Sequence, residues 1–141
     1  MHLEEKLFEA AETNPNALYT MSPREFELLV AELLHRQGYS IEVTPPSKDG
    51  GIDIYAAQSS EISNFLFLVE CKRYARHNPV QVDVVRSLYG NVAKKQATAG
   101  LVVTSSTFTR GARAFQREVA HQLSLRDYVD LHKWLARTRR K

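Results

Sequence analysis

Hydrophobic and polar positions near the start of the chain follow the period of a helix. Between Ser22 and Gly38, apolar side chains recur at the spacing of one helix face. The stretch "SPRE" supplies a Ser N-cap, a Pro at the first helical position and a Glu three residues after the cap. Gly38 is a natural C-terminal cap. We therefore predict a helix between these two residues, preceded by a shorter helix over 3–13 that "NPN" ends.

Beyond Gly38 the pattern changes to that of strands. Segments 39–44 and 52–57 alternate and enclose the turn formers of "PPSKDGG", which predicts a hairpin. Segments 65–70 and 99–106 are apolar at nearly every position, as is typical of strands covered on both faces. The other predicted elements are helices over 80–95, 107–122 and 126–138 and a short edge strand over 123–125. These elements predict an α/β fold with helices on both faces of a sheet.

Composition limits the class of protein. A chain of 141 residues with 43% hydrophobic content is large enough for one core. Cys71 is the single cysteine, so an internal disulfide and a cysteine-rich zinc site are both excluded. No stretch has the roughly 18 consecutive apolar residues of a membrane span, and the start lacks the pattern of a signal peptide. We expect a cytoplasmic protein without a membrane partner.

Charged residues at the end of one apolar strand are the first candidates for chemistry. In "LFLVECKRY", Glu70 and Lys72 lie two residues apart, so they point to the same side of a strand while Cys71 points away. Upstream, Asp53 stands between two isoleucines on the strand that we expect to be a sheet neighbour. A carboxylate there is costly to bury unless it is paired or binds a cation. A divalent metal would relieve the repulsion between Asp53 and Glu70.

Such a site favours hydrolysis of a phosphodiester. Mg²⁺ suits carboxylate oxygens and takes further oxygens from water and phosphate, and Mn²⁺ is an expected substitute. A bound metal lowers the pKa of water and polarises a phosphoryl oxygen. Lys72 would orient the attacking water or offset negative charge in the transition state.

Five segments, taken in order, resemble the Mrr-type restriction endonuclease family of the PD-(D/E)xK nuclease superfamily. They are "SPREFELLVAELLHRQGY", "DGGIDI", "VECKRY", "VRSLYG" and "LVVTSSTFTRGARAF", and the resemblance spans nearly everything from Met21 onward. It implies a restriction-endonuclease-like mixed β-sheet of about five strands flanked by helices on both faces. It also implies a metal held at Asp53 and Glu70, with Lys72 as the catalytic lysine. Ile52 stands where the nominal motif has Pro.

The resemblance implies supporting residues and a domain division as well. Glu27 matches an acid that can support the metal site in related nucleases, and Gln81 matches a polar position near it. We expect residues 1–20 to form an N-terminal helix and linker. Residues 21–141 would form the nuclease domain with a basic C-terminal tail.

Several residues are candidates for DNA contacts. Basic side chains follow the strand that carries Glu70, and others lie in the helix predicted over 107–122. The hydroxyl groups of "TSSTFT" could face a DNA phosphate at the N-terminus of that helix. Helix capping explains the same hydroxyls equally well. The candidates are Arg73, Arg76, Ser105, Ser106, Thr109 and Arg110.

Other residues have simpler explanations. Asp49 could assist a metal, but the "DGG" turn accounts for it. Cys71 is expected in the core, and the five histidines match no zinc spacing, although His77 follows the active strand. Trp134 and the apolar residues beside it suit a core or a subunit interface.

Three functional classes therefore remain. The leading prediction is a metal-dependent endodeoxyribonuclease that restricts DNA, including modified DNA. The alternatives are a silent DNA-binding or scaffold module of the same fold and a junction-resolving or repair nuclease. Because cutting both strands of a duplex calls for two active sites, a homodimer is one expectation. DNA recognition would come from a separate domain or subunit, or from the N-terminal residues and the basic tail.

Overall fold

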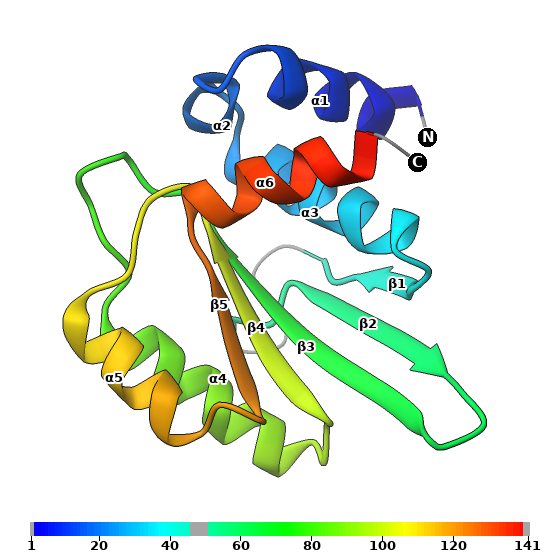
Figure 1. Cartoon of the computed structure of the whole chain (residues 1–141), viewed down its shortest axis with the longest axis vertical. Helices are drawn as coiled ribbons and strands as arrows, with labels where there is room; N and C mark the ends of the chain where they lie inside the picture. The colour runs from blue at the N-terminus through cyan, green and yellow to red at the C-terminus, as the bar shows by residue number, and fades with distance from the viewer. Residues whose placement is uncertain (1, 46–50, 140–141) are drawn as a thin grey trace.

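A five-stranded sheet forms the centre of the molecule (Figure 1). The computed structural model describes residues 2–45 and 51–139, and side chains from 5 to 138 within those ranges. Asp49, Arg140 and Lys141 therefore lie outside the described residues. The strands are β1 (Ser40–Val43), β2 (Ile54–Ser59), β3 (Asn64–Lys72), β4 (Ala99–Thr104) and β5 (Leu123–Arg126).

The sheet is mixed, as expected. Its strand order is β1-β2-β3-β4-β5; β1, β2 and β3 pair antiparallel, whereas β3, β4 and β5 pair parallel. The predicted hairpin of the first two strands is confirmed by the register Val43 to Ile54. β3 is the strand at which the antiparallel and parallel halves meet.

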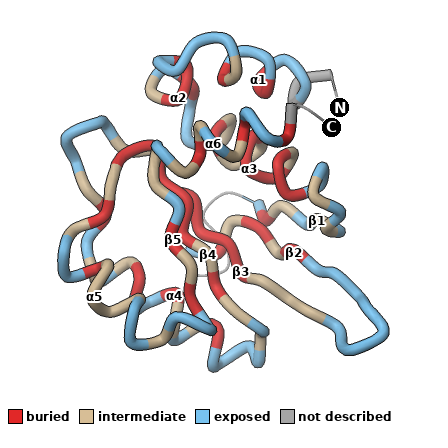
Figure 2. The backbone as a smooth tube through the Cα atoms, viewed as in Figure 1, coloured by how far each residue is buried: buried red, intermediate tan, exposed pale blue. Residues whose placement is uncertain are grey.

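Helices cover both faces of this sheet, which confirms the predicted layering (Figure 1). One face packs against α3 (Pro23–Arg36) and α6 (Tyr128–Arg139). On the outer side of these two helices lies α1 (His2–Thr13), with α2 (Ala17–Thr20) beside it (Figure 1). The other face packs against α4 (Val82–Lys94) and α5 (Arg110–Glu118). Along β3, Val69 and Cys71 belong to the first core, whereas Leu68 belongs to the second. Figure 2 shows buried residues concentrated in β3, β4 and α3 and an exposed tip on the β2–β3 hairpin.

The predicted N-terminal signal of α3 is confirmed in detail. The Ser22 side chain accepts a hydrogen bond from the backbone N–H of Glu25 at 3.0 Å, and the Glu25 carboxylate accepts from the Ser22 N–H at 2.8 Å. This capping box satisfies two otherwise free donors of the first turn. At the other end, Gly38 has φ of +101°, where a side chain would be strained.

The boundaries of other elements differ from the prediction. α5 starts at Arg110 and ends at Glu118, instead of covering 107–122. Phe108 forms a β-bridge with Val80, and the Thr109 side chain caps the helix by accepting from the Ala112 N–H at 3.1 Å. The short helix α2 was not predicted. No helix in the described part of the chain is both long and apolar enough to span a bilayer.

Candidate active site

Glu70 and Lys72 form an ion pair at the carboxyl end of β3. Lys72 Nζ lies 3.0 Å from Glu70 Oε2. Glu70 is buried, with only 6% of its surface exposed, and Cys71 between them packs into the core on the opposite face. The strand therefore orients the two charged side chains as its alternation predicted.

The pKa values of this pair follow from burial and from the contact itself. Burial raises the pKa of Glu70, the hydrogen bond and charge of Lys72 oppose this, and the negative charge of Asp83 adds to the rise. For Lys72, burial lowers the pKa, but the hydrogen bond and charge of Glu70 outweigh it, so the net pKa is raised. Lys72 is therefore an ammonium ion at neutral pH.

Asp53 immediately precedes β2, at a point where the strand pairing shifts by one residue. Ile54 is paired with Val69, yet the backbone N–H of Asp53 also donates to the Val69 carbonyl at 2.9 Å. The Asp53 Oδ2 atom accepts the backbone N–H of Cys71 at 2.7 Å. Irregular pairing of this kind re-aims side chains beside active sites. Here it places the Asp53 carboxylate against β3, next to Glu70.

Glu27 reaches the same place from α3. Arg24 Nη1 lies 3.0 Å from Glu27 Oε1 and donates to the Thr44 carbonyl at 2.8 Å. Thr44 Oγ1 in turn donates to the Ile52 carbonyl at 2.9 Å. These bonds hold the first turn of α3 against the segment that leads into β2. As a result, the Glu27 carboxylate lies close enough to Asp53 for its negative charge to raise the pKa of Asp53.

The electrostatic consequence is a strongly perturbed carboxyl group. Burial raises the pKa of Asp53 from 3.8 to about 7; the N–H of Cys71 opposes the rise, and the charges of Glu27 and Glu70 add to it. A bound cation would offset the repulsion among these carboxylates and so favour the ionised form of Asp53.

Gly51 lines the Glu70 side of the cluster. A Cβ at this position would meet Glu70 Oε2 at 3.5 Å, and the residue has φ of +97°. The missing side chain therefore leaves space beside the Glu70 carboxylate, and a substitution would be strained whatever that space allows. In the sequence, the turn predicted at "DGG" accounts for this glycine, so its position beside Glu70 was not predicted.

Two residues at the start of α4 complete the surroundings. Gln81 is the N-cap residue of α4, is exposed, and makes no capping bond with its side chain. Asp83, in the first turn, is close enough to Glu70 to raise the pKa of that carboxyl group. Sequence reasoning missed Asp83, because an acid in the first turn of a helix is ordinary on account of the helix dipole.

The cluster fits a divalent cation. Two carboxylates from neighbouring strands and a third from α3 repel one another, and the raised pKa of Asp53 measures how unfavourable its anionic form is without a counterion. In the described ranges, no three carboxylate, imidazole or thiol groups are arranged to hold an ion by themselves. Protein ligation would therefore fall to Asp53 and Glu70, with water and phosphate oxygens completing the shell, as is usual for Mg²⁺.

The hydroxyl residues at the end of β4 are buried, and two of them bind the end of β3 and the loop that follows it. Ser105 and Ser106 are both fully buried. Thr104 Oγ1 donates to the Lys72 carbonyl at 2.7 Å, and Ser105 Oγ donates to the Tyr74 carbonyl at 2.7 Å. The prediction that Ser105 and Ser106 contact DNA is therefore wrong, because a phosphate cannot reach them. Thr109 is used as the N-cap of α5.

The predicted basic contacts divide into two groups. Arg73 donates from Nη1 to the Tyr19 carbonyl at 3.2 Å, and its Nε is buried, so its guanidinium group is turned toward α2. Arg76 is exposed, with its guanidinium carbon 5.3 Å from the centre of the Tyr19 ring. Arg110 is exposed at the start of α5. Arg76 and Arg110 therefore stay accessible to DNA, whereas Arg73 anchors the loop after β3.

A cavity of about 400 Å³ lies on the other face of the sheet, under α3 and α6. Phe67, Val69 and Trp134 are among its lining residues. Glu70 and Lys72 point away from this face, so the cavity is separate from the carboxylate cluster. Leu131 and Leu135, on the same helix as Trp134, are buried in the core, as predicted.

Comparisons with known proteins find similarity to restriction endonucleases. A family model described as a restriction endonuclease, Mrr_cat, matches residues 18–135. The type IV methyl-directed restriction enzyme EcoKMrr of Escherichia coli (strain K12) is 32% identical over 107 residues, which are 72% of this chain and 34% of that enzyme.

Two solved restriction endonucleases have a similar fold. The DNA modification-dependent restriction endonuclease AspBHI has a TM-score of 0.65 and 23% identity, over 99% of this chain and 35% of that one. The MspJI restriction endonuclease, solved in complex with a 27-mer oligonucleotide, has a TM-score of 0.59 and 18% identity, over 96% of this chain and 30% of that one. The present chain spans about a third of the length of these relatives.

Proposed function

Because the chain belongs to the Mrr-type restriction endonuclease family, we propose that it hydrolyses phosphodiester bonds in DNA with Mg²⁺, or Mn²⁺ in its place, at Asp53 and Glu70. The observation that supports this assignment most is that the Asp53 carboxylate, just before β2, lies beside the Glu70 carboxylate and the Lys72 ammonium group of β3. The hydrogen bond from Cys71 fixes Asp53, and the 3.0 Å ion pair fixes Glu70 relative to Lys72. The same three residues carry the family's motif.

The carboxylates would hold the cation and Lys72 would act on the phosphate. A bound divalent ion supplies Lewis-acid activation of water and of the scissile phosphoryl group. Lys72 has a raised pKa, so it is unsuited to act as a general base. Its ammonium group instead donates hydrogen bonds, which suits it to orient the attacking water or to offset charge on the phosphoryl oxygens. Glu27, whose charge acts on Asp53, would support the binding of the cation from α3.

Modified DNA is the substrate class that we propose. The Escherichia coli relative is named as methyl-directed and AspBHI as modification-dependent. The match covers only 34% of the first and 35% of the second, so both contain parts that this chain does not match. We therefore assign cleavage to the present domain and recognition of the modification to another domain or subunit.

A plasmid assay tests the proposal directly. Methylated and unmethylated supercoiled plasmid would be incubated with wild type, Asp53→Ala and Lys72→Ala in Mg²⁺, in Mn²⁺ and in EDTA. We expect wild type to nick or linearise the plasmid only with metal, and both variants to lose this activity. Lys94→Ala is a matched control, because it removes an exposed lysine in the last turn of α4.

The products also separate the alternatives. Activity that survives both substitutions would remove the proposed mechanism. Metal-independent DNA binding without any cleavage by wild type would support the silent binding module instead. Direct conversion to linear plasmid would indicate that two active sites act together, as in a homodimer. Preference for branched DNA over methylated and plain duplexes would indicate a junction-resolving or repair nuclease.

A further inference from the structure

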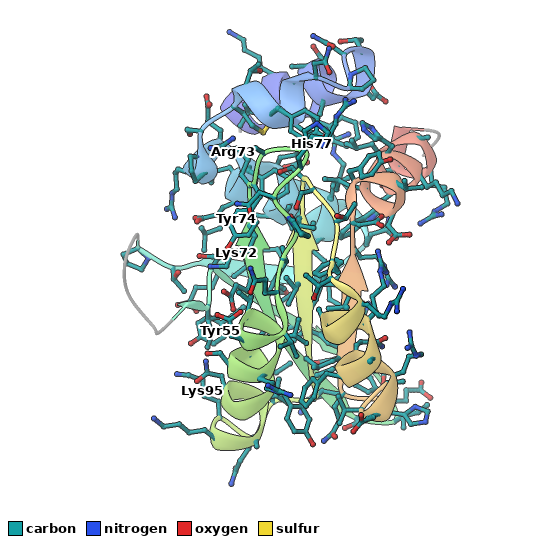
Figure 3. The ribbon with its side chains drawn as sticks, turned by 90° about the vertical axis from the view of Figure 1, so that its left-hand side faces the viewer. Tyr55, Lys72, Arg73, Tyr74, His77 and Lys95 are labelled. Carbon is teal, nitrogen blue, oxygen red and sulfur yellow. The ribbon has the colours of Figure 1, made fainter. Side chains whose placement is uncertain are left out.

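An aromatic residue and a basic residue, Tyr55 and Lys95, lie on the same side of the molecule as the proposed catalytic Lys72 (Figure 3). Tyr55 is on β2, two residues after Asp53, and is half-buried against α4. Lys95 is the C-cap residue of α4 and is exposed. Lys95 Nζ lies 5.8 Å from the centre of the Tyr55 ring. None of the functional assignments above uses this pair.

The pair extends a row of side chains that passes the active site. Figure 3 shows, from one end to the other, His77, Tyr74, Lys72, Tyr55 and Lys95 on one side of the molecule. We call these five residues the basic strip. His77 is exposed and the two tyrosines are half-buried, so the strip offers ring edges and basic groups together. Lys72, the proposed catalytic lysine, lies within the row and not at its end.

Two features make Lys95 available for an external anion. It forms no ion pair with any side chain in the described ranges 5–45 and 51–138, and its ammonium group lies over the Tyr55 ring. Because Lys95 is exposed, its contact with the half-buried Tyr55 ring contributes only about 0.5–1 kcal/mol, so the ammonium group keeps most of its capacity to bind a phosphate. The ring limits where the long side chain goes and so reduces the entropy lost on binding.

A purely structural role for Lys95 must be separated from DNA binding. A cation near the C-terminus of a helix is stabilised by the helix dipole. Lys94 is adjacent, exposed and in the last turn of the same helix, so it has the same dipole contribution and the same charge. Lys94 has no ring contact in the structure. It therefore serves as an internal control for Lys95.

We propose that the basic strip binds the sugar-phosphate backbone of a DNA strand, with Lys95 contacting a phosphate away from the bond that is cut. The proposal rests on the proposed nuclease function. α4 has 13 residues, and at 1.5 Å per residue its axis is about 20 Å long from the turn of Asp83, beside Glu70, to Lys95. This length is several times the 3.4 Å axial spacing of successive phosphates in one strand, so Lys95 would bind a phosphate other than the one that reacts.

Binding measured without cleavage tests the strip. Fluorescence anisotropy of a labelled duplex of about 24 base pairs would be followed in EDTA from 50 to 300 mM salt, for wild type, Lys95→Gln and Lys94→Gln. A single lost phosphate contact lowers the slope of log K against log salt by about 0.9. We expect that change for Lys95→Gln together with about a three- to tenfold weaker affinity. Lys94→Gln should bind like wild type, and Lys95→Arg should restore the slope.

The possible outcomes separate the strip from the nuclease assignment. If Lys95→Gln binds DNA with the affinity and slope of Lys94→Gln, the strip proposal is refuted even if wild type cleaves plasmid. If wild type binds DNA with the predicted difference but never cleaves, the strip stands and the nuclease assignment fails. Failure of wild type to bind duplex DNA would refute the strip. Urea unfolding of each variant confirms that the compared proteins are equally folded.

Discussion

Replacing Asp53 with Asn should stabilise the metal-free protein while it removes the proposed activity. The amide keeps an acceptor oxygen for the Cys71 N–H, which Asp53 Oδ2 accepts at 2.7 Å, and its NH₂ group can donate to Glu27. It therefore keeps the hydrogen bonds and removes only the negative charge. If the carboxylate cluster is organised for a cation, this charge is unfavourable in the absence of metal.

The size and pH window of the effect follow from the pKa of Asp53. The folded-state pKa is about 7, above the ordinary value of 3.8. A group with a raised folded-state pKa contributes stability that is fully present below about pH 4 and is lost as the pH rises toward 7. At about 1.4 kcal/mol per pKa unit, the complete loss is about 4 kcal/mol. Because Asp53 is only partly buried and solvent screens the charges around it, we expect Asp53→Asn to gain only about 2 kcal/mol at pH 8.

Urea unfolding at two pH values, with and without metal, measures this effect. In EDTA at pH 8 the variant should be more stable than wild type, and at pH 4 the difference should nearly vanish. Addition of Mg²⁺ should stabilise wild type at pH 8 and leave Asp53→Asn unchanged, because binding to the folded state alone raises stability. An Asp53→Asn protein that is less stable than wild type at pH 8 in EDTA would refute the reasoning. An equal gain at both pH values would also contradict it.

Three further substitutions test other parts of the site. Lys72→Met should lower plasmid cleavage by at least about 100-fold. It should also raise the pKa of Glu70 further, so that Mg²⁺ binding, followed by calorimetry, weakens more at pH 6 than at pH 8. Gly51→Ala should cost about 1–3 kcal/mol in urea unfolding because φ is +97°. A fully stable and active Gly51→Ala protein would contradict the role of this turn. Thr104→Val removes the 2.7 Å hydrogen bond to the Lys72 carbonyl. We therefore expect the free energy of unfolding to fall by about 1–2 kcal/mol and cleavage to become slower. An unchanged free energy of unfolding would contradict this role of Thr104.

Local signals were sufficient for some parts of the fold. The capping box at Ser22 and the positive φ at Gly38 are set within a few residues of sequence, and α3 has the predicted limits. The apolar character of β3 and β4 predicted coverage on both faces, because both cores draw on the same strands. The helix after β4 was predicted too long, since the bridge between Phe108 and Val80 joins segments that are distant in sequence.

The candidate site shows the same division between local and distant contacts. The shared orientation of Glu70 and Lys72 follows from strand alternation, which is a property of adjacent residues. The burial of Ser105 and Ser106 does not, because it depends on where the chain passes after β4 relative to the loop after β3. Asp83 was missed for the same reason.

The sequence by itself determined the periodicities, the caps, the apolar strands and the family's ordered motifs, because each is encoded in neighbouring residues. Only the tertiary structure decided that Glu27 meets Asp53, that the pairing shifts by one residue beside Val69, and that Arg73 turns toward Tyr19. It also decided the pKa of Asp53, since burial and the charges of residues on two other elements raise it. Long-range contacts set these quantities, and a single sequence specifies them only through the packing of the complete fold.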